Sequence, residues 1–392
     1  MSSDIARTGS RIVSIDLLRG LVMVIMAIDH VRDYWSQAGF DPLDLTQTTP
    51  QLFLTRWITH FCAPTFVFLS GASAWLYRRY KNVGTGELSR FLLTRGLWLV
   101  LIEITIVSMS WQFGYQIFIL QVIWAIGCSM IALAALVWLP WQAILGIGLV
   151  MIFGHNLLDG IAPERFGSMG WLWIILHVQH FIPLTIGWPQ GIAAPYPLIP
   201  WIGVMATGYV FGMLYELPAA RRDRVMVSIG IGAIVLFILL RSGNFYGDAQ
   251  HWSVQARGPL YTVLSFVNTT KYPPSLLYLL MTLGPAIALI PAFERLRGVV
   301  ADVLQTFGRV PFFFYVLHIP LIHASAIVWY WIAFDAPQLN LFGNPEQWPA
   351  AYHANLGRCY LVWAITVFAL YWPCRWFMNV RRRRSDWWLS YL

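Results

Sequence analysis

The sequence predicts an all-α membrane protein, a polytopic bundle of about ten transmembrane helices that forms a single domain over residues 1–392. Two observations predict this class. Hydrophobic residues make up 58% of the chain and charged residues only 11%, which is about half the charged fraction of an average soluble domain. In addition, apolar runs of roughly 20 residues, each long enough to cross a bilayer, follow one another from end to end and leave no room for a soluble domain.

Each expected helix is an apolar run bounded by polar residues, glycine or proline. The runs lie at about 13–34, 52–77, 90–111, 116–138, 142–158, 197–216, 225–241, 273–293, 309–333 and 354–379. The connection 159–196 contains an apolar patch, GWLWIILHV, which adds an eleventh helix if this segment inserts. Pro273 and Pro274 fit the first turn of the helix at 273–293, because a helix start leaves its first amides unused.

The distribution of basic residues predicts that both termini are cytoplasmic. Ten helices put the termini on one side, and that side holds all but seven of the 26 lysine and arginine residues, including a basic tail expected over 381–392. The seven exceptions are Arg32, Arg56, Arg165, Arg241, Arg257, Lys271 and Arg358. Because the basic clusters lie between apolar runs, the net charge of +8 indicates membrane orientation and not nucleic-acid binding.

Neither a disulfide framework nor a metal site is expected. The four cysteines, Cys62, Cys128, Cys359 and Cys374, have no CxxC spacing and are expected to be free thiols. Several histidines fall on the expected outer side, but no HxxxH or HxH spacing with a carboxylate accompanies them, so the sequence predicts no metal ligands.

The expected helix at 13–34 carries the main candidates for chemistry. Residues three and four apart share one face of a helix, and this spacing selects Asp16, Arg19, Met23, Met26, His30 and Asp33. Arg19 and His30 are separated by roughly 16 Å along the axis. An arginine inside a membrane helix needs a partner or an aqueous cavity. Arg19 therefore either forms a structural ion pair with Asp16 or receives an anionic ligand, such as phosphate, from the cytoplasm.

His30 lies near the outer end of this helix, where it either anchors the helix or acts as a general base. Asp29 beside it and Asp33 one turn later are placed to orient the ring and raise its basicity. Glu103 and His318 are ionisable groups inside other expected helices, which favours a functional role for them. A buried, hydrogen-bonded structural role explains Glu103 equally well.

Several segments of the chain resemble a family of bacterial membrane proteins. They are RIVSIDLLRGLVMVIMAIDHVRDYW, HFCAPTFVFLSGASAWL, VIWAIGCSMI, FGHNLLD, YPLIPWIGVMATGY, NTTKYPPSLLYLLMTLGP and FGRVPFFFYVLHIPLI. This family is allied to the catalytic domain of heparan-alpha-glucosaminide N-acetyltransferase and, more distantly, to the transmembrane acyltransferases that modify surface polysaccharides. The latter carry an arginine, ten residues and then a histidine in their first helix, a spacing that Arg19 and His30 match. In the glucosaminide branch the histidine is expected after the first helix, where residues 31–52 contain none.

The resemblance implies an acyltransferase of the bacterial inner membrane that uses acyl-CoA, most simply acetyl-CoA, and needs no metal. The acyl group would pass to a hydroxyl or amine of an extracytoplasmic glycan or glycolipid. The CoA phosphates would lie near Arg19, and the pantetheine arm would follow Met23 and Met26 to His30, which acts as general base or carries the acyl group. An oxyanion stabiliser is also required, and the candidates for it are His155, Asn156 and Lys271.

Two other functions fit the sequence. A proton- or charge-coupled transporter or lipid flippase would use Arg19, Glu103 and His318 as a relay. Such proteins often consist of two related halves, and the sequence shows none by eye. The third alternative is an enzyme-like membrane protein without activity. The acceptor, the acyl length and the presence of a homodimer cannot be read from the sequence.

Overall fold

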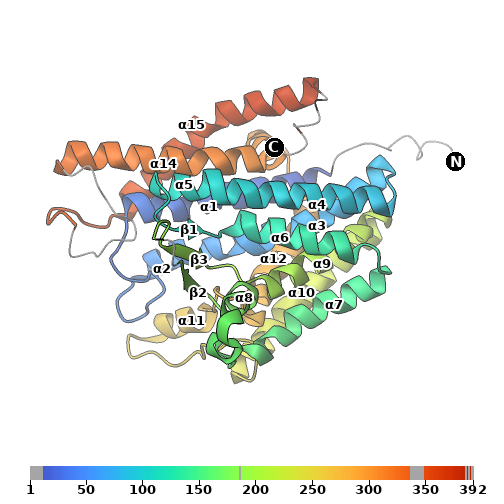
Figure 1. The fold of residues 1–392 in the computed structure, drawn as a ribbon, viewed down its shortest axis with the longest axis horizontal. Coiled ribbons are helices and arrows are strands. Elements are labelled where there is room, and N and C mark those ends of the chain that lie inside the picture. The colour runs from blue at the N-terminus through green and yellow to red at the C-terminus, as the bar shows by residue number, and fades with distance from the viewer. Residues whose placement is uncertain (1–11, 185–186, 336–347, 385, 387–388, 390–392) are drawn as a thin grey trace.

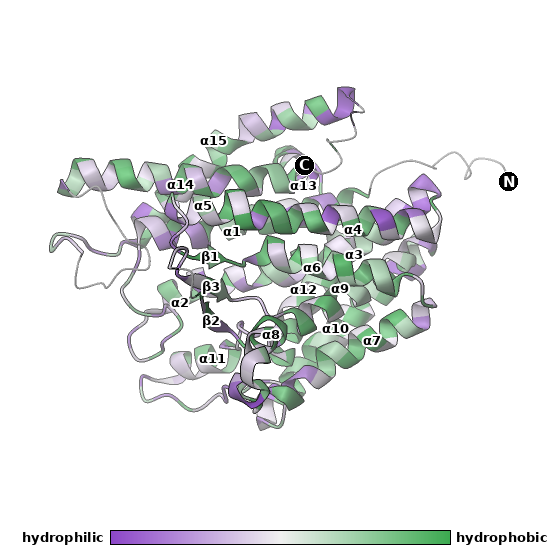
Figure 2. Ribbon diagram, in the orientation of Figure 1, coloured by the Kyte–Doolittle hydropathy of each residue, from purple (hydrophilic) through white to green (hydrophobic). Residues whose placement is uncertain are grey.

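The computed structural model describes residues 12–184, 187–335, 348–384, 386 and 389, and it shows an all-α membrane bundle whose long helices run side by side (Figure 1). About 74% of the chain is helical. Eight helices are long and apolar enough to cross a membrane, and Figure 2 shows these helices as mainly hydrophobic, with hydrophilic residues toward their ends. The fold class expected from the sequence is confirmed.

The helices follow the expected order along the chain. They are α1 (Val13–Trp35), α2 (Pro50–Trp57), α3 (Cys62–Lys81), α4 (Thr85–Ile102), α5 (Ser108–Gln112), α6 (Val122–Leu136), α7 (Trp141–Gly154), α8 (Gly170–Leu176), α9 (Leu198–Phe211), α10 (Ala219–Gly243), α11 (Pro259–Val267), α12 (Leu276–Arg295), α13 (Val299–Arg309), α14 (Pro311–Phe334) and α15 (Leu356–Arg383). Four of the eight spans consist of consecutive pieces. Helix α2 continues through a 3₁₀ segment (Ile58–Phe61) into α3, and α4 continues through a π-helical segment (Glu103–Val107) into α5. Helices α7 and α9 each continue into a 3₁₀ segment, which ends at Leu158 and Glu216, respectively.

Two of the ten expected spans are not among the eight apolar helices. The expected helix at 13–34 is α1, whose polar stripe lowers its hydropathy, and the one at 116–138 corresponds to α6, which has only 15 residues. The count of ten therefore stays a prediction. The four cysteines are free thiols, as expected.

Helix α1 is the central helix of the bundle. It packs against α3, α12, α13, α14 and α15, and Figure 1 shows it between α14 and α3. A polar stripe on such a helix faces protein and not lipid, which is where charged groups inside a membrane are tolerated.

Helix α13 was not expected, because the sequence predicts only a connection between 293 and 309. Its eleven residues are too few to cross a bilayer. It packs closely on α1, where a Cβ added to Gly20 would lie 1.9 Å from the Leu304 carbonyl oxygen, and one added to Gly308 would lie 1.7 Å from the Asp16 carbonyl oxygen. Glycine at both positions is therefore what allows the two backbones to touch. The contact brings Arg309, the last residue of α13, beside Asp16.

The connection 159–196 contains a small sheet and one short helix. In the sheet, β3 (Gly191–Ala194) lies between β1 (Phe118–Ile119), which is parallel to it, and β2 (His180–Pro183), which is antiparallel. Helix α8 has seven residues and is about 10 Å long, far short of the bilayer. Within the described residues 159–184 and 187–196, no helix can cross the membrane, so the eleventh span is not present there.

The start of α1 and the end of α15 lie at the same end of the bundle. Arg381 donates a hydrogen bond to the carbonyl oxygen of Arg309 at 3.0 Å, and Arg309 forms an ion pair with Asp16. Arg381 to Arg383 belong to α15, so the helix includes the first part of the predicted basic tail. Residues 385, 387–388 and 390–392 of that tail lie outside the described residues.

At the other end of the bundle, Arg241 near the end of α10 binds the connection that follows this helix. It is one of the seven basic residues that the sequence places on the side away from the termini, and its side chain is buried and donates to four carbonyl oxygens at 2.5 to 3.0 Å. The acceptors belong to Gln250, Ser265, Phe266 and Asn268. This guanidinium therefore holds the long connection between α10 and α12 in place.

The start of α12 differs slightly from the expectation. The helix begins at Leu276, and the Ser275 hydroxyl accepts a hydrogen bond from the Tyr278 amide as its N-cap. Pro273 and Pro274 lie before the helix and not in its first turn. A serine cap satisfies one of the unpaired amides of a helix start, which prolines cannot do.

Candidate functional site

Two adjoining cavities lie inside the bundle. The large cavity has a volume of about 590 Å³ and the small cavity about 180 Å³. Phe66, Val122 and Tyr315 line both, so the cavities meet at these three side chains. The large cavity falls within the range of roughly 300–1,000 Å³ that is typical of small-molecule sites.

The face of α1 selected by helical spacing runs along both cavities. Asp16, Arg19 and Met23 line the large cavity. Met26, His30 and Asp33 line the small one. The face passes from one cavity to the other between Met23 and Met26, so its six residues border the two adjoining cavities in succession.

Basic side chains dominate the charge of the large cavity. Its lining includes Arg19, Lys81, Arg95, Arg309 and Arg381, and Asp16 is the one carboxylate among the described residues that line it. The Asp16 carboxylate lies 3.6 Å from Arg19 Nη1 and 3.6 Å from Arg309 Nε. The ion pair of Arg19 with Asp16 is therefore present, and Arg19 also donates to the Ser73 hydroxyl at 2.7 Å. Five cations to one carboxylate make this cavity suited to an anion with several charges.

His30 pairs with His318 at the small cavity. His30 Nδ1 lies 2.7 Å from His318 Nε2, and His318 Nδ1 lies 2.7 Å from the Tyr315 carbonyl oxygen. A carbonyl oxygen only accepts, so His318 carries its proton on Nδ1 and offers Nε2 as an acceptor. The network thus assigns the proton of His30 to Nδ1, and leaves His30 Nε2 with a free electron pair.

This pairing differs from the one expected. Asp29 accepts from Arg56 and lies 2.7 Å from Arg32 Nη1, while Asp33 accepts from Arg32 at 2.6 Å. Among the described residues, no hydrogen bond or ion pair joins either carboxylate to the His30 ring. The arginines take the carboxylates because charge-assisted bonds are stronger than bonds to a neutral imidazole. His318, which the sequence singles out separately, is the partner.

Lys271 lies in the lining of the small cavity together with His30. Beside it is Tyr272, whose ring centre is 5.0 Å from the Lys271 ammonium nitrogen. Burial favours the neutral phenol, but the charges of Lys271 and Arg56, together with hydrogen bonds to Tyr196 and Lys271, outweigh this effect and hold the pKa of Tyr272 below its usual value. Neither Tyr272 nor Arg56 is among the site residues predicted from the sequence. The position of Tyr272 directly after Lys271, in the segment NTTKYPPS, could have indicated that it belongs to the site.

Glu103 is not among the described residues that line the two cavities, and its carboxylate caps a helix. Its carboxylate oxygens accept hydrogen bonds from the backbone amides of Gln121 and Trp124, each at 3.1 Å. These amides belong to the start of α6, where a carboxylate is stabilised by the unpaired N–H groups. These contacts favour the structural role of Glu103 over a relay with Arg19 and His318, and a functional role for Glu103 stays a prediction.

His155 and Asn156 are also away from both cavities. Asn156 accepts from the Leu276 amide at 2.9 Å and donates to Asp159 at 2.8 Å, so it ties the end of α7 to the start of α12. His155 packs against His177, with ring centres 5.8 Å apart. Of the three expected oxyanion stabilisers, the structure places only Lys271 in the described lining of the cavity that holds His30.

Comparison with known proteins agrees with the resemblance noted in the sequence. The family described as heparan-alpha-glucosaminide N-acetyltransferase, catalytic, matches residues 11–242, which is more than half of the chain. This match contains Arg19 and His30 and ends before Lys271 and His318. A search among curated proteins finds no match to the chain. The chain therefore belongs to the heparan-alpha-glucosaminide N-acetyltransferase catalytic family, which is in general terms a family of membrane acetyltransferases.

Proposed function

We propose that the protein transfers an acyl group, in the first instance acetyl, from cytoplasmic acyl-CoA to a hydroxyl or amine of a glycan or glycolipid on the other side of the bacterial inner membrane. The observation that carries this proposal is the face of α1 that borders both cavities. It has a cluster of cations at one end and a hydrogen-bonded histidine pair at the other.

The large cavity supports the donor part of the proposal. CoA carries several phosphates, and arginine side chains bind phosphate through two parallel hydrogen bonds. Arg19, Arg95 and Arg309 line this cavity together with Lys81 and Arg381. The nucleotide end of CoA would lie here, and its phosphates would compete with Asp16 for Arg19 and Arg309.

The junction of the cavities supports the path of the pantetheine arm. Met23 lines the large cavity and Met26 the small one, and both are buried. Their flexible side chains adapt to the shape of a bound chain. The distance of roughly 16 Å between Arg19 and His30 along the helix is suited to an extended pantetheine arm, so the thioester would reach the small cavity.

His30 supplies the base in the small cavity. Its Nε2 accepts the proton of the acceptor hydroxyl or amine while the acceptor oxygen or nitrogen forms a bond to the thioester carbonyl carbon. Lys271 and the Tyr272 hydroxyl stabilise the oxyanion. The carbon–sulfur bond then breaks, and the proton passes from His30 to the departing CoA sulfur. In the alternative route His30 Nε2 attacks the thioester carbonyl carbon, the carbon–sulfur bond breaks, and CoA leaves as a thiolate. The acceptor then attacks the acyl carbon, the bond from that carbon to Nε2 breaks, and the acceptor's proton goes to the CoA thiolate.

The donor half is tested by calorimetry of acetyl-CoA binding to the purified full-length protein in detergent. Arg19→Ala is expected to weaken binding about 10- to 100-fold, since it removes a charged hydrogen-bond donor worth roughly 1.5–3 kcal/mol. Arg375→Ala is the matched control, because Arg375 is an exposed arginine of α15 that contacts Tyr371 and does not line the large cavity. S-acetylpantetheine, which lacks the nucleotide phosphates, is expected to bind equally to wild type and Arg19→Ala.

The chemical half is tested with His30→Ala, which is expected to bind acetyl-CoA normally but to lose acetyl transfer. Rapid quenching with radiolabelled acetyl-CoA distinguishes the two routes, because only the second leaves label on wild-type protein and none on the variant. Undiminished transfer by folded His30→Ala would refute the assignment of the base. A folded wild-type protein that binds no acyl-CoA would refute the proposed donor.

A further inference from the structure

A second cluster of ionisable side chains lies outside both cavities. It consists of His155 and Asp159 at the end of α7 and His177 at the end of α8. One ligand atom from each of the three residues can be chosen so that all lie within 4.8 Å of one another. Two imidazoles and a carboxylate are a donor set that transition metals prefer, zinc among them.

The two histidines are buried without enough partners. His155 and His177 are each 1% exposed. Neither ring nitrogen of His155 has a hydrogen-bond partner among the described residues, and the same holds for Nδ1 of His177. An unsatisfied buried polar atom costs about 1–3 kcal/mol, so three such atoms in one cluster point to a ligand that binds nitrogen.

The third residue is held in position for the same ligand. Asp159 lies 3.1 Å from His177 Nε2, and its second oxygen accepts from the Asn156 amide at 2.8 Å. An outer hydrogen bond of this kind orients a ligating carboxylate. The Asp159 side chain is 29% exposed, so water can reach the cluster and complete a tetrahedral set.

We infer that His155, Asp159 and His177 bind one zinc ion, which fastens the end of α7 to the end of α8. One nitrogen of each imidazole and one carboxylate oxygen would be the protein ligands, and Asn156 would orient the carboxylate. The site is independent of acyl transfer, because none of its three residues lines the large or small cavity.

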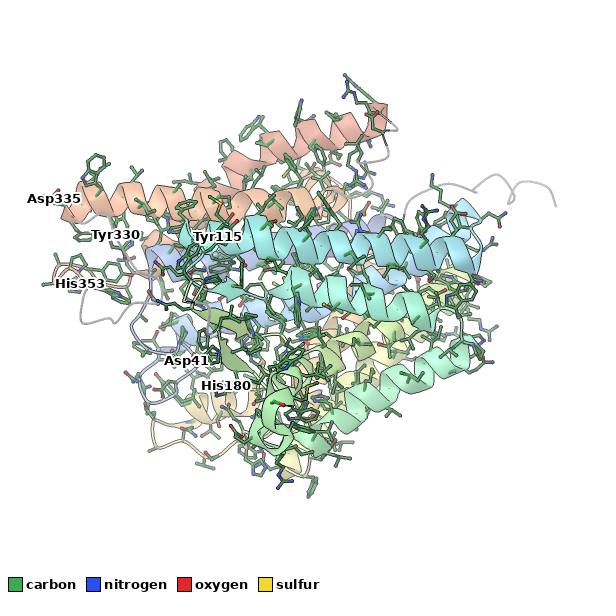
Figure 3. The ribbon with its side chains drawn as sticks, viewed as in Figure 1. Asp41, Tyr115, His180, Tyr330, Asp335 and His353 are labelled. Atoms are coloured by element: carbon green, nitrogen blue, oxygen red, sulfur yellow. The ribbon has the colours of Figure 1, made fainter. Side chains whose placement is uncertain are left out.

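The test measures metal content in the full-length protein, purified in detergent through a tag that binds no metal and without chelators. Elemental analysis is expected to find about one zinc per chain in wild type, and much less in Asp159→Asn and His177→Ala. His180→Ala is the matched control. His180 (labelled in Figure 3) is an exposed histidine three residues after His177 and begins β2. This variant is expected to keep its zinc.

A second measurement uses only the wild-type protein and therefore tests the zinc site even if the variants do not fold. Wild-type protein stripped with EDTA is expected to melt at a lower temperature and to regain stability as Zn²⁺ is added, because a ligand that binds only the folded state raises stability with its concentration. Magnesium is expected to have no effect. The inference is overturned if wild type contains no zinc and added Zn²⁺ leaves melting unchanged. It is equally overturned if folded Asp159→Asn keeps the wild-type zinc content.

Discussion

Replacement of Gly308 by alanine tests the contact that positions the basic cluster. A Cβ at residue 308 would lie 1.7 Å from the Asp16 carbonyl oxygen and 2.9 Å from the Gly20 amide nitrogen, whereas ordinary contact begins at 3.4 Å. Both neighbours are backbone atoms and cannot rotate away, so α13 must shift from α1. Overpacking of this kind costs about 1–3 kcal/mol, and it also moves Arg309 relative to Asp16.

The assay is equilibrium unfolding in mixed micelles, with SDS as the denaturant and tryptophan fluorescence as the readout. We expect Gly308→Ala to lower the free energy of unfolding by about 1–3 kcal/mol. Gly232→Ala is the matched control, because Gly232 lies within α10 and a Cβ there would meet no atom within 4 Å. This control is expected to leave stability unchanged or to raise it by up to about 1 kcal/mol, the usual gain in helix propensity.

Comparison of the two variants distinguishes the steric clash between α13 and α1 from the effect that any glycine-to-alanine change in a helix has on stability. If Gly308→Ala unfolds at the wild-type free energy, then α1 and α13 do not touch through Gly308, and the placement of Arg309 beside Asp16 is wrong. If both variants are destabilised equally, the loss has another cause than the contact between these helices.

Three further predictions concern single polar groups. His318→Leu removes the buried acceptor of the His30 Nδ1 proton, and the loss of such an acceptor costs about 1–3 kcal/mol. The rate of acetyl-CoA-dependent CoA release should therefore fall about 10- to 100-fold, while the affinity for acetyl-CoA stays unchanged. Glu103→Gln replaces one of two acceptors of α6 amides by a donor, and is expected to lower the unfolding free energy by about 1–3 kcal/mol. Arg241→Met leaves four carbonyl oxygens without their donor, and should lower it by at least about 3 kcal/mol.

A specific experimental outcome would contradict each of these three predictions. His323→Leu, which removes a buried histidine of α14 that bonds to the Ser110 carbonyl oxygen, should keep the turnover rate, and equal losses in both variants would remove the special role of His318. Wild-type unfolding of Glu103→Gln would show that the carboxylate does not cap α6. For Arg241→Met, limited proteolysis should cut the connection between α10 and α12 faster, and an unchanged cleavage rate would contradict its role there.

The sequence predicts the long helices well because a bilayer leaves an apolar run few alternatives to a helix. The run at 354–379 corresponds to α15, which begins two residues later and ends four residues later. The sequence predicts the start of α10 at 225, which is too late, because Arg221, Arg222 and Arg224 belong to the first turns of the helix. It does not predict α13, because an amphipathic helix of eleven residues is too short to form an apolar run of bilayer length.

In the candidate site, the residues that belong to one helix were predictable from the sequence, whereas the contacts between residues far apart in the chain were not. The face from Asp16 to Asp33 was predictable because its residues belong to one helix with a known period. The contact of His30 with His318 joins residues 288 positions apart, and no pattern in a single sequence reports such a distance. The three residues of the proposed zinc site were only partly predictable. His155 and Asp159 are only four residues apart, but His177 belongs to another element, and the three residues do not form the HxxxH or HxH spacing that predicts a metal site from sequence.

The meeting point of the two cavities has a consequence for the membrane itself. A protein with a cavity toward each end of a membrane bundle is at risk of becoming a pore, and a pore would dissipate the ion gradients on which the cell depends. Phe66, Val122 and Tyr315 are buried at this point, and largely apolar side chains oppose the passage of hydrated ions. The residues that would border a thin acyl arm are therefore also the ones that would oppose a leak of ions across the membrane.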